Sequence, residues 1–314
     1  MTPSQPLAGG YVDLQVNGAA GHDLTEDPAA VWAVGAALAR YGVTAFLPTL
    51  VSPGFEVVDL AMSVLAAGPP AGYAGATALG WHIEGPFLSP ARAGAHDPAT
   101  LRKPDVGAVR DWSPAVGVRI VTLAPELPAA LDVAERLVGN GVVVSAGHSA
   151  ATFDQARAGF DAGIRAVTHL FNAMSPLDHR DPGLPGAAMV DPRVTIGLIP
   201  DGIHVHPAMV RIVRAAVGAE RLAIVTDAIA ALGMPPGRHR LAGREVEVRT
   251  DETGERGALD APRGASARLP DGTLAGSVLA MDQAVRNLAA FCEVEPARAA
   301  LAATAVPRAL LGLG

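Results

Sequence analysis

The sequence predicts a single (β/α)8 barrel, and three observations lead to this prediction. The chain has 314 residues, half of them hydrophobic, which suits one α/β barrel of about 250 residues. Eight short apolar runs rich in β-branched residues alternate with helical patterns. Each run is followed by a loop of Gly, Pro and polar residues. An open doubly wound sheet is the alternative that the same alternation allows.

Each predicted strand is a short apolar run with β-branched residues. The third strand must end at Gly85-Pro86, because proline cannot donate to the sheet. The fifth and sixth strands belong to the stretches VVVSAGHS and AVTHLFN. In chain order, the eight runs are 11–16, 43–47, 78–84, 118–123, 142–149, 166–172, 194–199 and 222–225.

Capping residues mark the starts of the helices between these strands. Asp27-Pro28 is a cap followed by proline at the first helical position, and that helix ends near Gly42. Ser149 or Thr152 would cap the helix that ends at Ala162. The remaining predicted helices cover 53–67, 129–138, 207–217, 277–291 and 296–311.

Residues 233–276 interrupt the alternation. They contain short polar runs of β character, such as 245–250, and many Gly, Arg and Asp residues. We therefore expect residues 1–314 to form one barrel with a hairpin-bearing insertion at 233–276, after the eighth strand.

Composition excludes several classes of protein. The net charge of −7, without a basic cluster, argues against nucleic-acid binding. We expect no membrane span and no secretory signal, since no apolar run reaches about 18 residues and MTPSQPLAGG lacks basic and apolar regions. The single cysteine, Cys292, suits a reducing, cytoplasmic location. Lys103 is the only lysine, so a carbamylated-lysine metal bridge would need that residue.

Two successive strands end in a histidine, His148 and His169. The carboxyl ends of parallel strands meet at one end of a barrel, where ligand sites lie. Glu84 ends the third strand, and two imidazoles with a carboxylate form a catalytic zinc-type set. Asp227, after the eighth strand, could take a proton from water and pass it to a leaving group. His96 could donate to a developing oxyanion.

Each of these residues also has a structural interpretation. A lone histidine at a strand end is more often structural, but two on neighbouring strands with Glu84 reverse that weighting. Asp227 and Glu126 could each cap a helix, so Glu126 is left out of the metal set. His82 shares a face with Glu84 and is expected to pack or to support the ligands. The other histidines are expected to be solvated or structural, namely His22, His179, His206 and His239.

A series of short motifs runs from near the N-terminus to the last helices. They are DLQVNG (13–18), HIEGPFLSP (82–90), RAGAHDP (92–98), TLAPE (122–126), SAGHS (145–149), THLFNAM (168–174), DGIHV (201–205), VTDA (225–228) and LAGS (274–277). In these motifs and their order the sequence resembles the N-acetylglucosamine-6-phosphate deacetylase family of the amidohydrolase superfamily. HIEGPFLSP and THLFNAM are the specific ones. The resemblance implies a metal-dependent barrel enzyme that hydrolyses the acetamide of a sugar phosphate.

The resemblance also implies roles for individual residues. Glu84, His148 and His169 would hold the metal, with Asp227 as general base and acid. His96 would polarise the acetyl carbonyl. The sugar phosphate would be held by Asn172, Ala173 and His204. Arg180 matches an arginine that the family supplies from the neighbouring subunit, which implies a homodimer.

Two features depart from the superfamily pattern. The first strand ends in Gln15-x-Asn17 instead of His-x-His, and carboxamides are weak zinc ligands beside imidazole. We therefore expect one divalent metal per subunit, zinc in first place, with iron or another divalent metal as the alternative. The family's small β-sandwich domain is expected to be largely missing, unless 233–276 forms a remnant of it.

Alternatives from two classes remain open. The same metal and Asp227 could serve hydrolysis of another N-acyl amino sugar or a cyclic amide. A barrel that only binds a sugar phosphate as a sensor is the alternative outside enzymes, and the intact set of candidate residues weighs against it.

Overall fold

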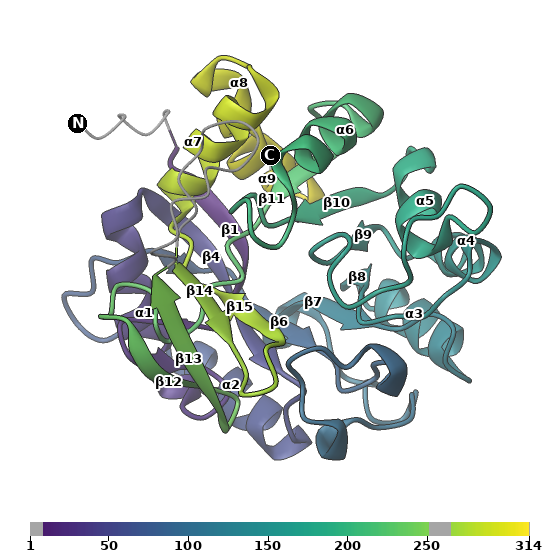
Figure 1. Ribbon diagram of the computed structural model, residues 1–314. Helices are drawn as coiled ribbons and strands as arrows, with labels where there is room; N and C mark the ends of the chain where they lie inside the picture. Colours follow the sequence, from purple (N-terminus) through teal and green to yellow (C-terminus); the bar gives the residue numbers. More distant parts are fainter. Residues whose placement is uncertain (1–8, 251–264, 314) are drawn as a thin grey trace.

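Eight parallel strands surround a common axis in the computed structural model, which describes residues 9–250 and 265–313 (Figure 1). Each strand pairs with the next one in the chain, as in a (β/α)8 barrel. The barrel predicted from the sequence is thus confirmed. Its strands are β1 (Tyr11–Val16), β4 (Val43–Val51), β6 (Trp81–Glu84), β7 (Val118–Leu123), β8 (Val143–Ala146), β9 (Ala166–Val167), β10 (Thr195–Leu198) and β11 (Leu222–Ile224).

The barrel closes between its last and first strands without a regular ladder. The backbone N–H of Asp227 donates to the Gln15 carbonyl at 3.0 Å, just beyond the end of β11. The buried Asp13 carboxyl in β1 accepts from the Thr226 hydroxyl at 2.5 Å and from the Thr226 N–H at 3.3 Å. Burial raises the pKa of Asp13 to about 7. The Asp13 side chain therefore joins the first strand to the segment after the last one, next to Asp227, the predicted general base. We call this junction the seam of the barrel.

Helices follow most strands and cover the outside of the barrel (Figure 1). Asp27 accepts from the N–H of Ala29, as the predicted cap requires. Thr152 and Gln155 form a reciprocal capping box, which selects Thr152 over Ser149 as the cap. The helices are α1 (Val31–Leu38), α2 (Phe55–Ala67), α3 (Ala130–Gly139), α4 (Phe153–Asp161), α5 (Gly183–Val190), α6 (Pro207–Val217), α7 (Met281–Cys292), α8 (Pro296–Ala300) and α9 (Ala305–Leu310).

Two predicted elements are interrupted. The strand expected over 78–84 divides into β5 (Thr77–Ala78) and β6, because Gly80 adopts a φ of 135° between them. The helix expected over 296–311 breaks between α8 and α9. Pro307 explains this break, since its ring would clash with the carbonyl four residues earlier in a continuous helix.

A four-stranded antiparallel sheet occupies the region predicted as an insertion. Its strands are β12 (Gly237–Leu241), β13 (Arg244–Thr250), β14 (Ala265–Arg268) and β15 (Leu274–Ser277). It has its own apolar cluster, which includes Val246 and Ala267 and also Val51 at the end of β4. Part of the predicted insertion, 251–264, lies outside the described residues. The sheet thus packs against the carboxyl end of a barrel strand, while the division of the chain into barrel and insertion stays a prediction.

None of the helices in the described ranges combines the length and the apolar character that crossing a bilayer requires.

Candidate metal centre and active site

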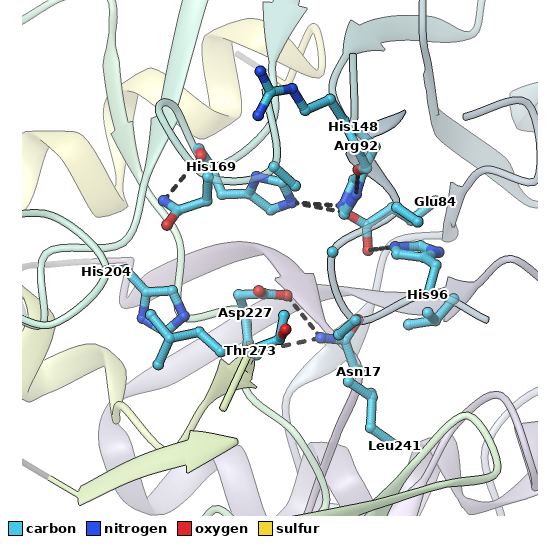
Figure 2. Close-up of a pocket in the computed structure, with 18 of the residues that line it drawn as sticks. Asn17, Glu84, Arg92, His96, His148, His169, His204, Asp227, Leu241 and Thr273 are labelled. Carbon is cyan, nitrogen blue, oxygen red and sulfur yellow. Dashed lines mark hydrogen bonds and ion pairs between the residues drawn. The ribbon is translucent and has the colours of Figure 1, made fainter. Parts of the chain in front are cut away.

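Glu84, His148 and His169 converge at the carboxyl end of the barrel (Figure 2). Glu84 is the last residue of β6, and each histidine follows its strand by two residues. Glu84 Oε1 lies 3.3 Å from His148 Nε2 and 3.0 Å from His169 Nε2, and the two Nε2 atoms are 3.1 Å apart. All three side chains are buried. The structure thus brings together the three residues predicted to hold a metal.

The donor set fits a divalent metal. His148 Nδ1 lies 3.1 Å from the Arg92 carbonyl, which can only accept, so the proton of the neutral ring is on Nδ1. His148 Nε2 therefore presents a lone pair to the cluster. Ligand atoms about 2.0–2.1 Å from one tetrahedral zinc ion are about 3.3 Å apart, close to the separations found here. The three side chains could hold one ion and leave a fourth position open.

The surroundings keep Glu84 ionised. Burial would raise the pKa of Glu84, but the neighbouring imidazoles of His148, His169 and His96 outweigh it and hold that pKa well below its usual range. Gln15 Nε2 also donates to Glu84 Oε1 at 3.0 Å. An ionised carboxylate is the form that binds a metal.

The chain turns sharply at His148, His169 and Asp227. The φ angles are 47° at His148, 32° at His169 and 52° at Asp227, all in the left-handed region. Histidine and aspartate tolerate this region better than branched residues, but it still costs free energy. The turns direct these side chains into the mouth of the barrel.

Glu126 holds the loop that carries His148. Its carboxylate accepts from the Ser149 hydroxyl at 2.7 Å and from the Ala150 N–H at 2.6 Å. Glu126 is therefore neither a metal ligand in this arrangement nor a helix cap. It fixes the backbone directly after His148.

Asp227 faces the same pocket and is held by a carboxamide. Asn17 Nδ2 donates to Asp227 Oδ1 at 2.7 Å. Burial raises the pKa of Asp227 to about 6, and the neighbouring Glu84 carboxylate adds to the shift. A carboxyl group with this pKa can accept a proton and release it near neutral pH.

His96 lies beside Glu84 in the loop after β6 (Figure 2). Its Nδ1 is 2.7 Å from the Ser52 hydroxyl, and its Nε2 is 3.7 Å from Glu84 Oε2. Burial lowers the pKa of His96 to about 4, so the ring is neutral at pH 7. Because Ser52 can donate to Nδ1, the ring proton can sit on Nε2, which is the atom a carbonyl oxygen would need as donor.

His204 is fixed by an aspartate that the sequence analysis did not single out. Asp201 Oδ2 lies 2.6 Å from His204 Nδ1, and Asp201 Oδ1 accepts from the N–H groups of Ile203 and His204. The side chain of His204 is only 6% exposed. The motif DGIHV contained a signal for this pair, since Asp201 stands three residues before His204 and shortly after a strand.

One pocket of about 330 Å³ collects nearly all of the predicted site residues. The exception is Arg180, which is exposed and does not line this pocket. Lining residues that were not predicted as site residues include Arg92, Leu241 and Thr273. His82 does not reach the pocket: it is buried below, between Thr122 Oγ1 at 2.7 Å and the Leu14 carbonyl at 3.1 Å. The predicted residues that do line it are Glu84, His96, His148, His169, Asn172, Ala173, His204 and Asp227.

A parallel barrel with a Glu-His-His cluster and an aspartate at its carboxyl end defines a hydrolase of the metal-dependent type. The chain belongs to the amidohydrolase family, whose model matches residues 7–314.

Among its relatives, the chain is 38% identical to the N-acetylgalactosamine-6-phosphate deacetylase of Escherichia coli O157:H7, over 98% of this chain and 78% of that protein. It is 40% identical to the N-acetylglucosamine-6-phosphate deacetylase of Homo sapiens, over 98% and 75%. A solved mutant of the N-acetyl-D-glucosamine-6-phosphate deacetylase from Mycobacterium smegmatis, in complex with N-acetyl-D-glucosamine-6-phosphate, is also similar. It has a TM-score of 0.85 and 38% identity, covering 97% of this chain and 77% of that one.

Proposed function

We propose that the protein hydrolyses the acetamide of N-acetylglucosamine 6-phosphate to glucosamine 6-phosphate and acetate. The observation that carries the proposal is the Glu84, His148 and His169 cluster in one pocket with Asp227. The names of the relatives support the substrate, and the donor set supports hydrolysis of an amide.

Glu84, His148 and His169 would hold one divalent metal, with zinc as the proposed ion and iron as the alternative. A metal held there would supply Lewis-acid chemistry, since it would lower the pKa of a water molecule and polarise the acyl carbonyl. The carboxamides of Gln15 and Asn17 support a single metal, because they already donate to Glu84 and Asp227.

Asp227 would accept the proton of the attacking water and then donate it to the departing amine. Its pKa of about 6 suits both directions of transfer near neutral pH. His96 Nε2 would donate to the acetyl oxygen as negative charge develops on it. These roles divide the reaction between a carboxyl group and a neutral imidazole that line the same pocket.

Asn172, Ala173 and His204 would hold the sugar phosphate, with His204 oriented by Asp201. Arg180 would reach the site of the neighbouring subunit in a homodimer. Its exposed position outside its own pocket is compatible with that role. We further propose that the enzyme acts in the cytoplasm.

Acetate release from N-acetylglucosamine 6-phosphate by the wild type and by Asp227→Asn tests the proposal. Loss of a general acid–base should lower kcat by about 100-fold or more. Asp111→Asn, at an exposed ion pair with Arg110, is the matched control and should keep the wild-type rate. Equal rates for Asp227→Asn and the wild type would refute the proposed base. No release by the metal-loaded wild type would refute the substrate.

The galactosamine epimer is a second candidate substrate. The Escherichia coli relative named for N-acetylgalactosamine 6-phosphate is about as similar to this chain as those named for the glucosamine sugar. The two sugars differ only in the configuration of one ring hydroxyl. A comparison of kcat/KM for both, with unphosphorylated N-acetyl sugars and a cyclic amide as further substrates, ranks these possibilities. A wild type that binds the sugar phosphates without releasing acetate would be a sensor.

A further inference from the structure

We propose that Arg92 binds the phosphate group of the substrate from within the same chain. This inference rests on the proposed function and adds a cationic contact to the residues already assigned to the sugar phosphate. Arg92 is the lining residue of the pocket with a permanent positive charge. It is partly buried, and Figure 2 shows its side chain running from the His148 side of the pocket toward the side on which His169 is drawn.

The backbone of Arg92 is firmly held. Its N–H donates to the Ser89 carbonyl at 2.9 Å, and its carbonyl accepts from His148 Nδ1 at 3.1 Å. The far end of the loop is fixed by Arg244, whose Nη1 donates to the carbonyls of Ala95 and His96. The loop is therefore anchored at both ends, and the guanidinium group of Arg92 extends from a fixed base.

The loop lies against the residues predicted to hold the sugar phosphate. Gly94 has a φ of 58°, and a Cβ atom at this position would be 3.2 Å from the Ala173 Cβ and 3.3 Å from His148 Cε1. The backbone two residues after Arg92 thus touches both a metal-ligand loop and Ala173. Arg92 and Asn172-Ala173 consequently line one pocket from two contacting loops.

The charges in the pocket favour a role for Arg92 in binding an anion. Within the described residues, no carboxylate lies within 4.0 Å of the Arg92 guanidinium, and none of its nitrogen atoms has a hydrogen-bond partner. The acidic side chains of the pocket, Glu84 and Asp227, belong to the reacting centre. A phosphate monoester carries a charge of about −1.5 to −2 at pH 7. A guanidinium group matches phosphate oxygens with two parallel donors, so the unpaired Arg92 suits this ligand.

The experiment compares N-acetylglucosamine 6-phosphate with unphosphorylated N-acetylglucosamine on the metal-loaded protein. Arg92→Met should lower kcat/KM for the phosphorylated sugar by about 10- to 100-fold, mainly through KM, as expected for one charge-assisted contact. It should leave kcat/KM for the unphosphorylated sugar within about twofold. Arg92→Lys should restore part of the loss. Arg238→Met, at an exposed position of β12, is the control and should behave as wild type.

Metal content separates this role from a merely structural one. Because the Arg92 carbonyl supports His148, a disturbed backbone would lower metal content and the rates on both sugars equally, which would overturn the proposal. Unchanged KM for the phosphorylated sugar would also overturn it, as would full loss of phosphate preference in Arg180→Met alone.

A binding measurement makes the test independent of turnover. Calorimetry with glucosamine 6-phosphate and with glucosamine should show about tenfold or greater weakening of the phosphorylated ligand alone in Arg92→Met. If the wild type releases no acetate, the proposed function fails and this measurement still decides the role of Arg92. Equal affinity of wild type and variant, or no binding by either, overturns it.

Discussion

Asp13 provides a quantitative prediction about the seam of the barrel. Asp13→Asn keeps the shape of the side chain but removes the ionisable group. The amide can donate to the Thr226 hydroxyl, whose own hydrogen can turn to the Gln15 carbonyl, 3.5 Å away. The hydrogen bonds accepted from the backbone N–H groups of Gln15 and Thr226 can remain. The variant should therefore fold like the wild type.

The pKa of Asp13 fixes the sign and size of the effect. Burial raises that pKa from 3.8 to about 7, so the folded state holds a proton that the unfolded state releases between these values. The contribution of Asp13 to stability is fully present below pH 3.8 and is lost as the pH rises through 7. At about 1.4 kcal/mol per pH unit, the total loss in the wild type is about 4 kcal/mol. Asp13→Asn should not show this loss.

Urea unfolding of both proteins at intervals from pH 5 to pH 8 measures the effect. The stability of Asp13→Asn relative to wild type should rise by about 2–3 kcal/mol between pH 5 and pH 7 and then level off. Bound metal and titrating groups that do not interact with Asp13 contribute equally to both proteins and cancel in the difference. The repulsion between Asp13 and Asp227 does not cancel and belongs to the effect of the substitution. Asp59→Asn, on the exposed side of α2, controls for the loss of a charge. A difference between Asp13→Asn and wild type that does not change with pH would refute this account.

Three further predictions concern a helix cap, a loop and the metal. Thr152→Ala should lower the free energy of unfolding by about 1 kcal/mol, because α4 loses its capping box. Thr152→Ser should keep the capping box and the wild-type stability. Equal melting temperatures of the wild type and both variants would contradict this. Glu126→Ala should weaken zinc binding by about tenfold in a chelator competition, because the loop of His148 loses the two hydrogen bonds to Glu126. Unchanged affinity would show that the loop keeps its conformation without Glu126. Elemental analysis should find one tightly bound metal per chain, and removal of that metal should abolish acetate release until zinc is restored; two tightly bound metals would contradict the assignment of Gln15 and Asn17.

The strands were predictable because their apolar runs end in chemically distinct residues. β1 and β7 have the predicted bounds, and Glu84 ends β6 as expected. β9 is the contrast, with only Ala166 and Val167 in the ladder. The chain leaves the sheet there to place His169 in a left-handed turn, and apolar periodicity carries no information about such a turn.

Helix α5 was missed because its sequence resembles a loop. It begins Gly-Leu-Pro-Gly, and both glycine and proline disfavour helix interiors. Residues 183–188 are buried, so packing against α4, α6 and β10 supplies the stability that propensity does not. Local rules cannot anticipate such tertiary support.

The residue types of the candidate site could be predicted from the sequence. The residues that hold these side chains and loops in place were harder to predict. Metal-binding residue types after successive strands were visible in the sequence. Ser52 beside His96 and Glu126 beneath His148 could not be assigned these roles, because they act across loops that are distant in the chain. Such partners depend on loop conformation, which sequence patterns leave open.

The left-handed turns at His148, His169 and Asp227 have a consequence for engineering. Glycine adopts such backbone angles without steric penalty, so at each of these positions it would relax the chain while removing a group proposed to act in the reaction. Selection for heat resistance alone would therefore tend to enrich variants that have lost the chemistry. A campaign to stabilise this barrel should screen for turnover in every round, or exclude these three codons from its library.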